Sequence, residues 1–146
     1  MLYATKYVFS IPILFGLCLI AACKSEDEGD TIPKTEEELQ LEKLSKTWIP
    51  GFIQRDGVDV TGEFSGFTLT FTQNKTYTAV NGGEVFPASG TWEFATGNLN
   101  RMVRDDGVVM EVVVTATTLN LQFQIDSPGG RFAGTSGDFE FDLITQ

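Results

Sequence analysis

The sequence predicts an all-β fold, an eight-stranded up-and-down antiparallel barrel with a short N-terminal helix. Apolar and polar residues alternate with period two in most segments after residue 46, as in residues 118–125. Strands of this kind have one buried and one solvated face, which is typical of antiparallel sheets. Short turns rich in glycine, asparagine and aspartate separate the segments, which favours tight links between neighbouring strands. A two-sheet β-sandwich is the alternative fold.

The helix is predicted from Glu36 to about Ser45. Thr35 and Glu38 have the spacing of a capping box, in which each side chain accepts a hydrogen bond from the other's backbone N–H. The leucines at positions 39, 41 and 44 form one apolar side over two turns. A helix this short is not stable alone, so it must dock on the rest of the domain.

Eight strands are predicted near residues 48–55, 66–73, 76–81, 88–95, 99–105, 108–116, 118–125 and 138–144. The turn at residues 105–107 has the sequence Asp-Asp-Gly, in which Asp-Gly favours a tight hairpin. Further turn signals lie at residues 73–75, 81–83 and 96–98, and the longest loop opens at residues 127–130. An eight-stranded barrel is either filled by its own side chains or holds one small ligand.

The N-terminus is predicted to be a targeting segment, residues 1–22, that takes no part in the fold. The apolar run at residues 7–22 is too short to span a membrane, which needs about 20 residues, and is typical of a secretory signal. It ends in Ile-Ala-Ala followed by Cys23, which resembles the lipobox of bacterial lipoproteins. That resemblance implies cleavage before Cys23 and a lipid on its thiol. The alternative is an ordinary signal peptide with a chance cysteine.

Residues 23–35 are predicted to be a disordered acidic tether, and residues 36–146 the barrel domain. The tether has little to bury, and it reaches at most about 40 Å at roughly 3.3 Å per residue. Its acidic cluster at residues 26–30 resembles the surface-export signal of lipoproteins in the Bacteroidota. The expected location is therefore the outer membrane, lipid-anchored and facing outward. The alternative is a protein that faces the periplasm.

Composition excludes several functional classes. The chain has 146 residues, with 10 basic against 20 acidic residues and a formal charge of −10, so we expect no nucleic-acid partner. It has no histidine, and its two cysteines, Cys18 and Cys23, both lie near the N-terminus. Histidine-dependent catalysis, thiol nucleophiles and thiolate metal sites are therefore not expected in the domain. The sequence predicts no enzyme, no metal and no cofactor.

Several segments together resemble the lipocalin-like lipoproteins of the Bacteroidota, within the wider calycin group. They are the helix that runs into Lys46-Thr47-Trp48, the strand at residues 67–71 with the turn at 74–77, Ser-Gly-Thr-Trp at 89–92, and the strand at 117–121. The resemblance covers residues 36–144. It implies a lipocalin-like barrel in which Trp48 closes one end, and it implies no enzymatic activity.

The candidate ligand site is the interior of the predicted barrel. The inward phase of the strands selects Phe67, Phe71, Tyr77, Trp92, Phe94, Met110, Phe123 and Phe141. These side chains either line an apolar pocket or pack together as a filled core. Phe52, Phe64 and Phe86 lie near strand ends, where they form either an exposed patch or a lid.

Two functions remain open. The first is a carrier, in which the barrel binds a small apolar ligand. The second is a structural or interaction lipoprotein, in which a solid barrel contacts a larger complex at the cell surface.

Arg101 or Arg131 is a candidate for binding an anionic group at a barrel mouth or for stacking on Trp48. The alternative is that these two residues and Arg104 are ordinary surface arginines.

Overall fold

The computed structural model describes residues 33–126 and 136–146. The predicted signal peptide, Cys23, most of the tether and Arg131 lie outside these residues. The elements are α1 (Glu36–Leu44), β1 (Thr47–Arg55), β2 (Val58–Asp59), the 3₁₀ helix η1 (Thr61–Phe64), β3 (Thr68–Phe71), β4 (Thr76–Val80), β5 (Ser89–Ala95), β6 (Asn98–Arg104), β7 (Val109–Val114), β8 (Thr118–Ile125) and β9 (Gly137–Thr145).

The sheet closes on itself as an up-and-down antiparallel barrel. Strands β1 and β3 to β9 pair in chain order, and β1 also pairs with β9, so eight strands form the barrel. The predicted fold class is therefore confirmed. The short strand β2, which was not predicted, pairs only with the end of β1 after a turn in which Asp56 and Gly57 both have positive φ.

The capping box is present at the start of α1. Thr35 Oγ1 accepts a hydrogen bond from the Glu38 N–H at 3.2 Å, and Glu38 Oε2 accepts one from the Thr35 N–H at 2.8 Å. The helix ends at Leu44, whose side chain is fully buried and whose carbonyl accepts a hydrogen bond from Trp48 Nε1 at 3.0 Å. Leu44 and the partly buried Leu41 thus dock the helix on the barrel, as its short length requires, whereas Leu39 of the predicted apolar side is exposed.

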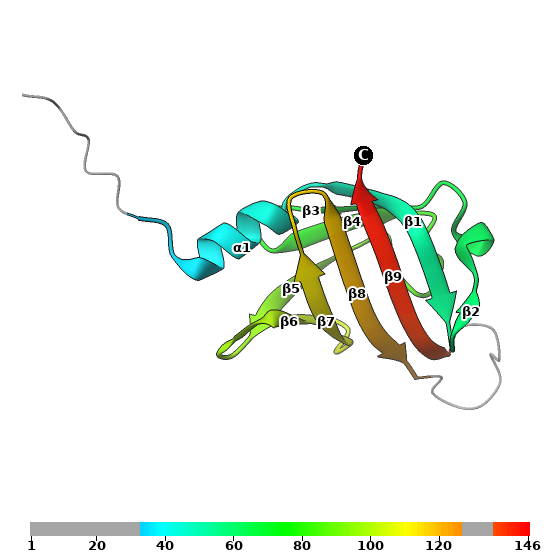
Figure 1. The fold of residues 1–146 in the computed structure, drawn as a ribbon. Helices are drawn as coiled ribbons and strands as arrows, with labels where there is room; N and C mark the ends of the chain where they lie inside the picture. The colour runs from blue at the N-terminus through cyan, green and yellow to red at the C-terminus, as the bar shows by residue number, and fades with distance from the viewer. Residues whose placement is uncertain (1–32, 127–135) are drawn as a thin grey trace, which may run out of the picture. The chain divides into compact units, whose positions relative to one another are not determined.

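One end of the barrel, here called the helix end, lies under α1. Glu37 of the helix pairs with Lys75 in the β3–β4 turn at 2.6 Å. Gln40 donates a hydrogen bond to the Leu99 carbonyl of β6 at 3.4 Å. Figure 1 shows α1 at this end and β2 at the opposite one.

The opposite end, here called the mouth, carries three described loops, at residues 56–67, 81–88 and 105–108. The loop at residues 81–88 joins β4 to β5 and is called the plug loop below. Its Phe86 is 1% exposed although it belongs to no strand. The plug loop therefore contributes to the core from outside the sheet.

Aromatic rings fill the barrel in two groups. Nearer the mouth, the ring of Phe141 in β9 lies 4.9–5.6 Å from three other rings, those of Phe64, Phe67 and Phe123. Nearer the helix end are Phe71, Tyr77, Trp92 and Phe94. Phe86 joins the groups, because its ring lies 6.0 Å from Tyr77 and 5.7 Å from Phe141. The core residues that the structure describes lie within the compact unit Pro33–Gln146.

We predict that Phe141→Ala lowers the free energy of unfolding by about 3–5 kcal/mol, the usual loss when a fully buried phenylalanine is truncated. Phe141 is 0% exposed and contacts other rings on several sides. Urea denaturation measures the change. Phe52→Ala is the control, because Phe52 is 40% exposed on the outer face of the same sheet. Equal losses in the two variants would contradict this description of the core.

Candidate functional site

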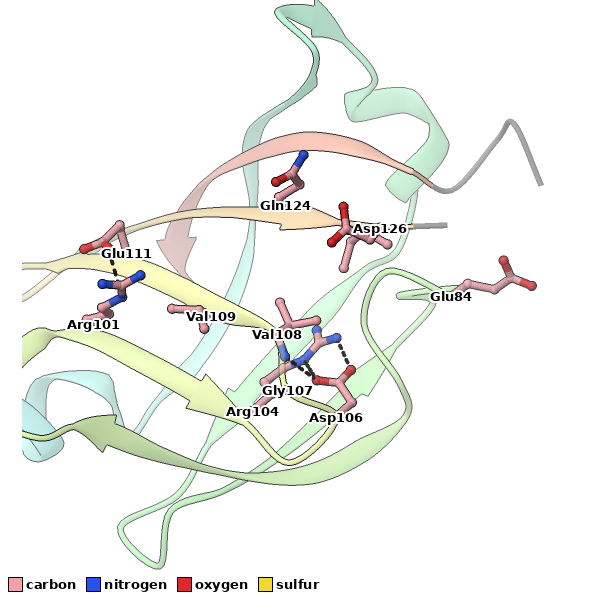
Figure 2. Close-up of a pocket in the computed structure, with 11 residues that line it drawn as sticks. Glu84, Arg101, Arg104, Asp106, Gly107, Val108, Val109, Glu111, Gln124 and Asp126 are labelled. Carbon is pink, nitrogen blue, oxygen red and sulfur yellow. Dashed lines mark hydrogen bonds and ion pairs between the residues drawn. The ribbon is translucent and has the colours of Figure 1, made fainter. Parts of the chain in front are cut away.

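A cleft of about 660 Å³ opens at the mouth beside the β6–β7 turn. Its walls come from β6, β7, the end of β8 and the plug loop (Figure 2). The lining residues are Glu84, Arg101, Arg104, Asp106, Gly107, Val108, Val109, Glu111, Gln124, Ile125 and Asp126. It is larger than the other clefts described below.

The cleft exists because two neighbouring strands separate. The β7–β8 ladder ends at the pair Met110↔Phe123, whereas β8 continues to pair with β9 as far as Ile125↔Gly137. Val109 and Gln124, which follow next on the two strands, line the cleft from opposite sides. The end of the ladder thus decides where the cleft lies, and the side chains then decide its chemistry.

Arg104 lies at the inner end of the cleft and is only 3% exposed. It is the last residue of β6 and shares the inward phase of Met102. Among the described residues it is the only polar or charged residue that is buried. A buried guanidinium requires partners for its donors.

Two partners satisfy this guanidinium. The Asp106 carboxylate accepts bonds from Nε, at 3.1 Å, and from Nη2. Nη1 donates to the carbonyl of Val85 in the plug loop at 2.8 Å. The guanidinium also lies over the Phe86 ring, 4.8 Å from its centre. Arg104 therefore connects the β6–β7 turn to the plug loop.

Asp106 also organises its own turn. Its Oδ1 accepts a hydrogen bond from the Val108 N–H at 3.2 Å, and the Gly107 N–H donates to the Arg104 carbonyl at 2.9 Å. Gly107 has φ +87°, the left-handed conformation that Asp-Gly turns supply. Partial burial raises the pKa of Asp106, but the hydrogen bonds from Arg104 and Val108 outweigh it and lower that pKa below its ordinary value.

The outer part of the cleft is acidic. Arg101 forms an ion pair with Glu111 on the neighbouring strand at 3.3 Å, so its charge is balanced within the cleft. Asp126 adds a carboxylate at the rim, and Glu84 also lies there (Figure 2). Of the described residues that line the cleft, four are acidic and two are basic.

The eight predicted ligand-binding residues do share the barrel interior. Seven of them are buried, and Phe94 is partly buried and packs against that core. Their ring centres lie 5.0–6.4 Å apart where neighbours meet, as for Trp92–Phe94 and Phe71–Tyr77. They contact one another, which is the packing expected of a filled core. Ligand binding by these residues stays a prediction.

Two polar atoms inside this core have no hydrogen-bond partner among the described residues, Tyr77 OH and Trp92 Nε1. Burial raises the pKa of Tyr77, and the nearby Arg104 charge opposes that rise only in part. The Tyr77 ring lies against Gly90 of β5, where any side chain would meet the ring within 2.7 Å. The tyrosine is therefore fixed with its hydroxyl buried close enough to Arg104, Asp105 and Asp106 for their charges to affect its pKa.

Phe64 and Phe86 are buried at the mouth and form the lid that was one of the two predicted alternatives. Phe52 is exposed on β1, as the other alternative, an exposed patch, requires. Arg104 is buried, and its interpretation as a surface arginine is wrong. Arg104 is buried because the inward and outward alternation of β6 continues to its last residue, which places this side chain on the inner face. The cation over the Trp48 ring is Lys46, at 5.9 Å, whereas Arg101 pairs with Glu111.

A second acidic area lies on the outer face of the barrel, across β1, β9 and β8. Glu140 accepts hydrogen bonds from Asn120, Gln122 and Gln54 at 2.7–3.1 Å. Asn120 contributes most, and together the three amides outweigh slight burial and lower the pKa of Glu140. This carboxylate is held ionised, which is the opposite of what a general acid needs. A smaller cleft of about 380 Å³ lies beside it, next to Gly57 and Asp138.

No protein-family model, curated protein or solved structure matches this chain. Within residues 33–126 and 136–146, no three histidine, cysteine or acidic side chains gather closely enough to hold a metal ion. In the same residues, no helix has the length and apolar character needed to cross a membrane. The site is therefore interpreted from its own geometry.

We predict that Asp106→Asn lowers the free energy of unfolding at pH 7 by about 1.5–3 kcal/mol, the value of hydrogen bonds to a charged group. The folded pKa of Asp106 is lowered, so its contribution is complete above the unfolded value of 3.8 and disappears as pH falls through the folded pKa. The difference between wild type and variant in urea denaturation should therefore shrink as pH falls below about 4.

The control for this experiment is Asp126→Asn, which removes an exposed carboxylate from the same cleft. It should change the free energy of unfolding by less than about 0.5 kcal/mol. A loss at Asp106 that is independent of pH, or an equal loss at Asp126, would contradict the role given to the Arg104–Asp106 pair.

Proposed function

We propose that this chain is a non-catalytic, lipid-anchored outer-membrane lipoprotein that faces outward and contacts a protein partner through the mouth of its barrel. The proposal rests on one observation, that the barrel interior is filled while a cleft is open at the mouth. The inward aromatic side chains pack against one another, whereas a cleft of about 660 Å³, lined by charged and apolar side chains, opens at the mouth. This division favours an interaction protein over a carrier with an open pocket.

The direction of the chain supports the same proposal. The segment that would carry the lipid, residues 23–35, leads into α1, and α1 covers the helix end. The cleft lies at the mouth, at the other end of the strands. A protein anchored through Cys23 would therefore have its mouth on the side of the domain away from the tether.

Charge indicates the chemistry of the partner. The chain carries a formal charge of −10, so the domain is repelled by an anionic membrane surface. Asp126 is an exposed carboxylate at the rim of the cleft, while Val109 adds an exposed apolar contact. A protein surface with basic side chains around a small apolar centre would match this cleft in both respects.

We predict that Cys23→Ser moves the protein from the membrane fraction to the soluble fraction, because lipid would be its main attachment. Fractionation of cells that express each form measures this. Wild-type protein should in addition be cut by protease added to intact cells. Cys18→Ser is the control, because it leaves the lipobox intact and should not change the distribution. Membrane retention of the Cys23→Ser protein would contradict the anchor, and protection of the wild type would place it facing the periplasm.

We predict that a photo-crosslinking residue at Val109 forms a protein adduct in intact cells, whereas the same residue at Val113 does not. Val109 is 38% exposed in the cleft, and Val113 is 62% exposed on the same strand, farther from the mouth. The two positions are matched in strand and in face. Equal adducts at both positions, or none at Val109, would contradict binding through the mouth.

A further inference from the structure

We propose that the barrel mouth is also a ligand site, which Val85 and Phe86 of the plug loop occupy in this structure. The geometry points to a small neutral molecule in which an aromatic ring is joined to a carbonyl group. This inference concerns the barrel interior and is independent of the lipid anchor and of the protein partner.

Phe86 occupies the interior as a ligand ring would. It enters from a loop, not from a barrel strand, and its ring lies 5.5–6.0 Å from four rings of the barrel wall. Those four rings are Phe67, Tyr77, Phe123 and Phe141. Three of them belong to barrel strands and the fourth directly precedes β3, so removal of Phe86 would leave an apolar cup with its wall intact.

The polar contact of the plug is equally ligand-like. The Val85 carbonyl accepts a hydrogen bond from Arg104 Nη1 at 2.8 Å, and both residues are buried. Arg104 belongs to the barrel, whereas Val85 belongs to the loop. Together the carbonyl of Val85 and the ring of Phe86 meet one buried donor and one aromatic cup, which is how small-molecule sites combine polar and apolar contacts.

Charge decides between a neutral and an anionic ligand. Asp106 already balances the Arg104 charge through two hydrogen bonds, so the buried pair is close to neutral. A carboxylate ligand would add a second negative charge next to Asp106 in a poorly hydrated place, which is unfavourable. The group that Arg104 binds here is a peptide carbonyl, and a neutral carbonyl can replace it without altering this balance.

Two unpartnered donors border the same space. Tyr77 OH and Trp92 Nε1 are buried without partners among the described residues. Tyr77 contacts the Phe86 ring, and Trp92 is the cross-strand partner of Arg104. Buried donors of this kind are normally satisfied, so their presence favours a ligand with further acceptor atoms over a purely apolar one.

The plug loop is built so that its buried part is small. Gly83 and Glu84 are exposed, whereas Val85 and Phe86 are buried. The start of the loop is held by the hydrogen bond from Asn81 Nδ2 to the Gly66 carbonyl at 3.2 Å, so displacement would be confined to the residues that follow. The ligand must compete with Val85 and Phe86. Its apparent affinity equals its intrinsic affinity multiplied by the fraction of molecules in which these two residues have left the site.

The test titrates residues 33–146, which contain the complete core, with N-acetylphenylalaninamide while backbone amides and the Arg104 side chain are followed by NMR. Saturable shifts at residues 82–88 and at Arg104 Nε–H are expected. Phe86→Ala should bind this probe about tenfold or more tightly, because the competing ring is gone. Phe86→Leu is used in the same way should the alanine variant not fold.

Phe71→Ala is the matched control, because it removes a buried ring of equal size nearer the helix end, whose ring neighbours are Tyr77 and Trp92, and it should gain less than about twofold. Ethylbenzene, which has the ring but no carbonyl, and N-acetylphenylalanine, which is anionic, should both bind the Phe86 variants more weakly than the amide. The proposal is overturned by an equal gain in Phe71→Ala, by stronger binding of either comparison probe, or by the absence of shifts at residues 82–88 in wild type and variants.

Discussion

The buried guanidinium of Arg104 constrains how the barrel closes at its mouth. A charge placed among aromatic rings is strongly unfavourable unless its hydrogen bonds are satisfied. Asp106 in the β6–β7 turn and the Val85 carbonyl in the plug loop supply the acceptors. Satisfying one side chain therefore fixes two loops that are far apart in the sequence, and it holds Phe86 between the two aromatic groups of the core.

The two ends of the barrel are closed by different means. At the helix end, Leu44 and Trp48 are fully buried, and the Trp48 indole N–H is satisfied by the Leu44 carbonyl. This end is therefore closed by apolar side chains, and the indole N–H buried among them has its hydrogen-bond partner. At the mouth, closure depends on a loop residue and on a charged pair. The mouth is therefore where the proposed partner and ligand are placed.

Much of the fold follows from local pattern. The capping box at Thr35 and Glu38 and the inward phase of residues such as Leu121 and Phe141 depend on nearest neighbours and on a period of two, which the sequence displays directly. The Asp-Asp-Gly turn before β7 is predicted for the same reason, since its backbone requirement is local.

The site is less predictable because it depends on non-local geometry. Phe86 becomes a core residue only through the path of the plug loop, and no periodic pattern specifies that path. The cleft depends on the β7–β8 ladder ending at Met110↔Phe123. Arg104 was within reach of the sequence, because the alternation of β6 places it inward with Met102. An inward arginine directly before an Asp-Asp-Gly turn is the signal that would have indicated it.

The interior of the barrel is filled by the chain's own side chains, including that of Phe86. A crystal structure of residues 33–146 under xenon pressure tests it most directly, because xenon enters dry apolar cavities of about 150 Å³ without needing polar contacts. For a filled interior we expect no xenon between Phe67, Phe123 and Phe141. Phe86 should be in place, and Arg104 should donate its hydrogen bond to the Val85 carbonyl. Xenon in a connected interior void, with Phe86 inside the barrel, would contradict a filled interior and would favour an open carrier.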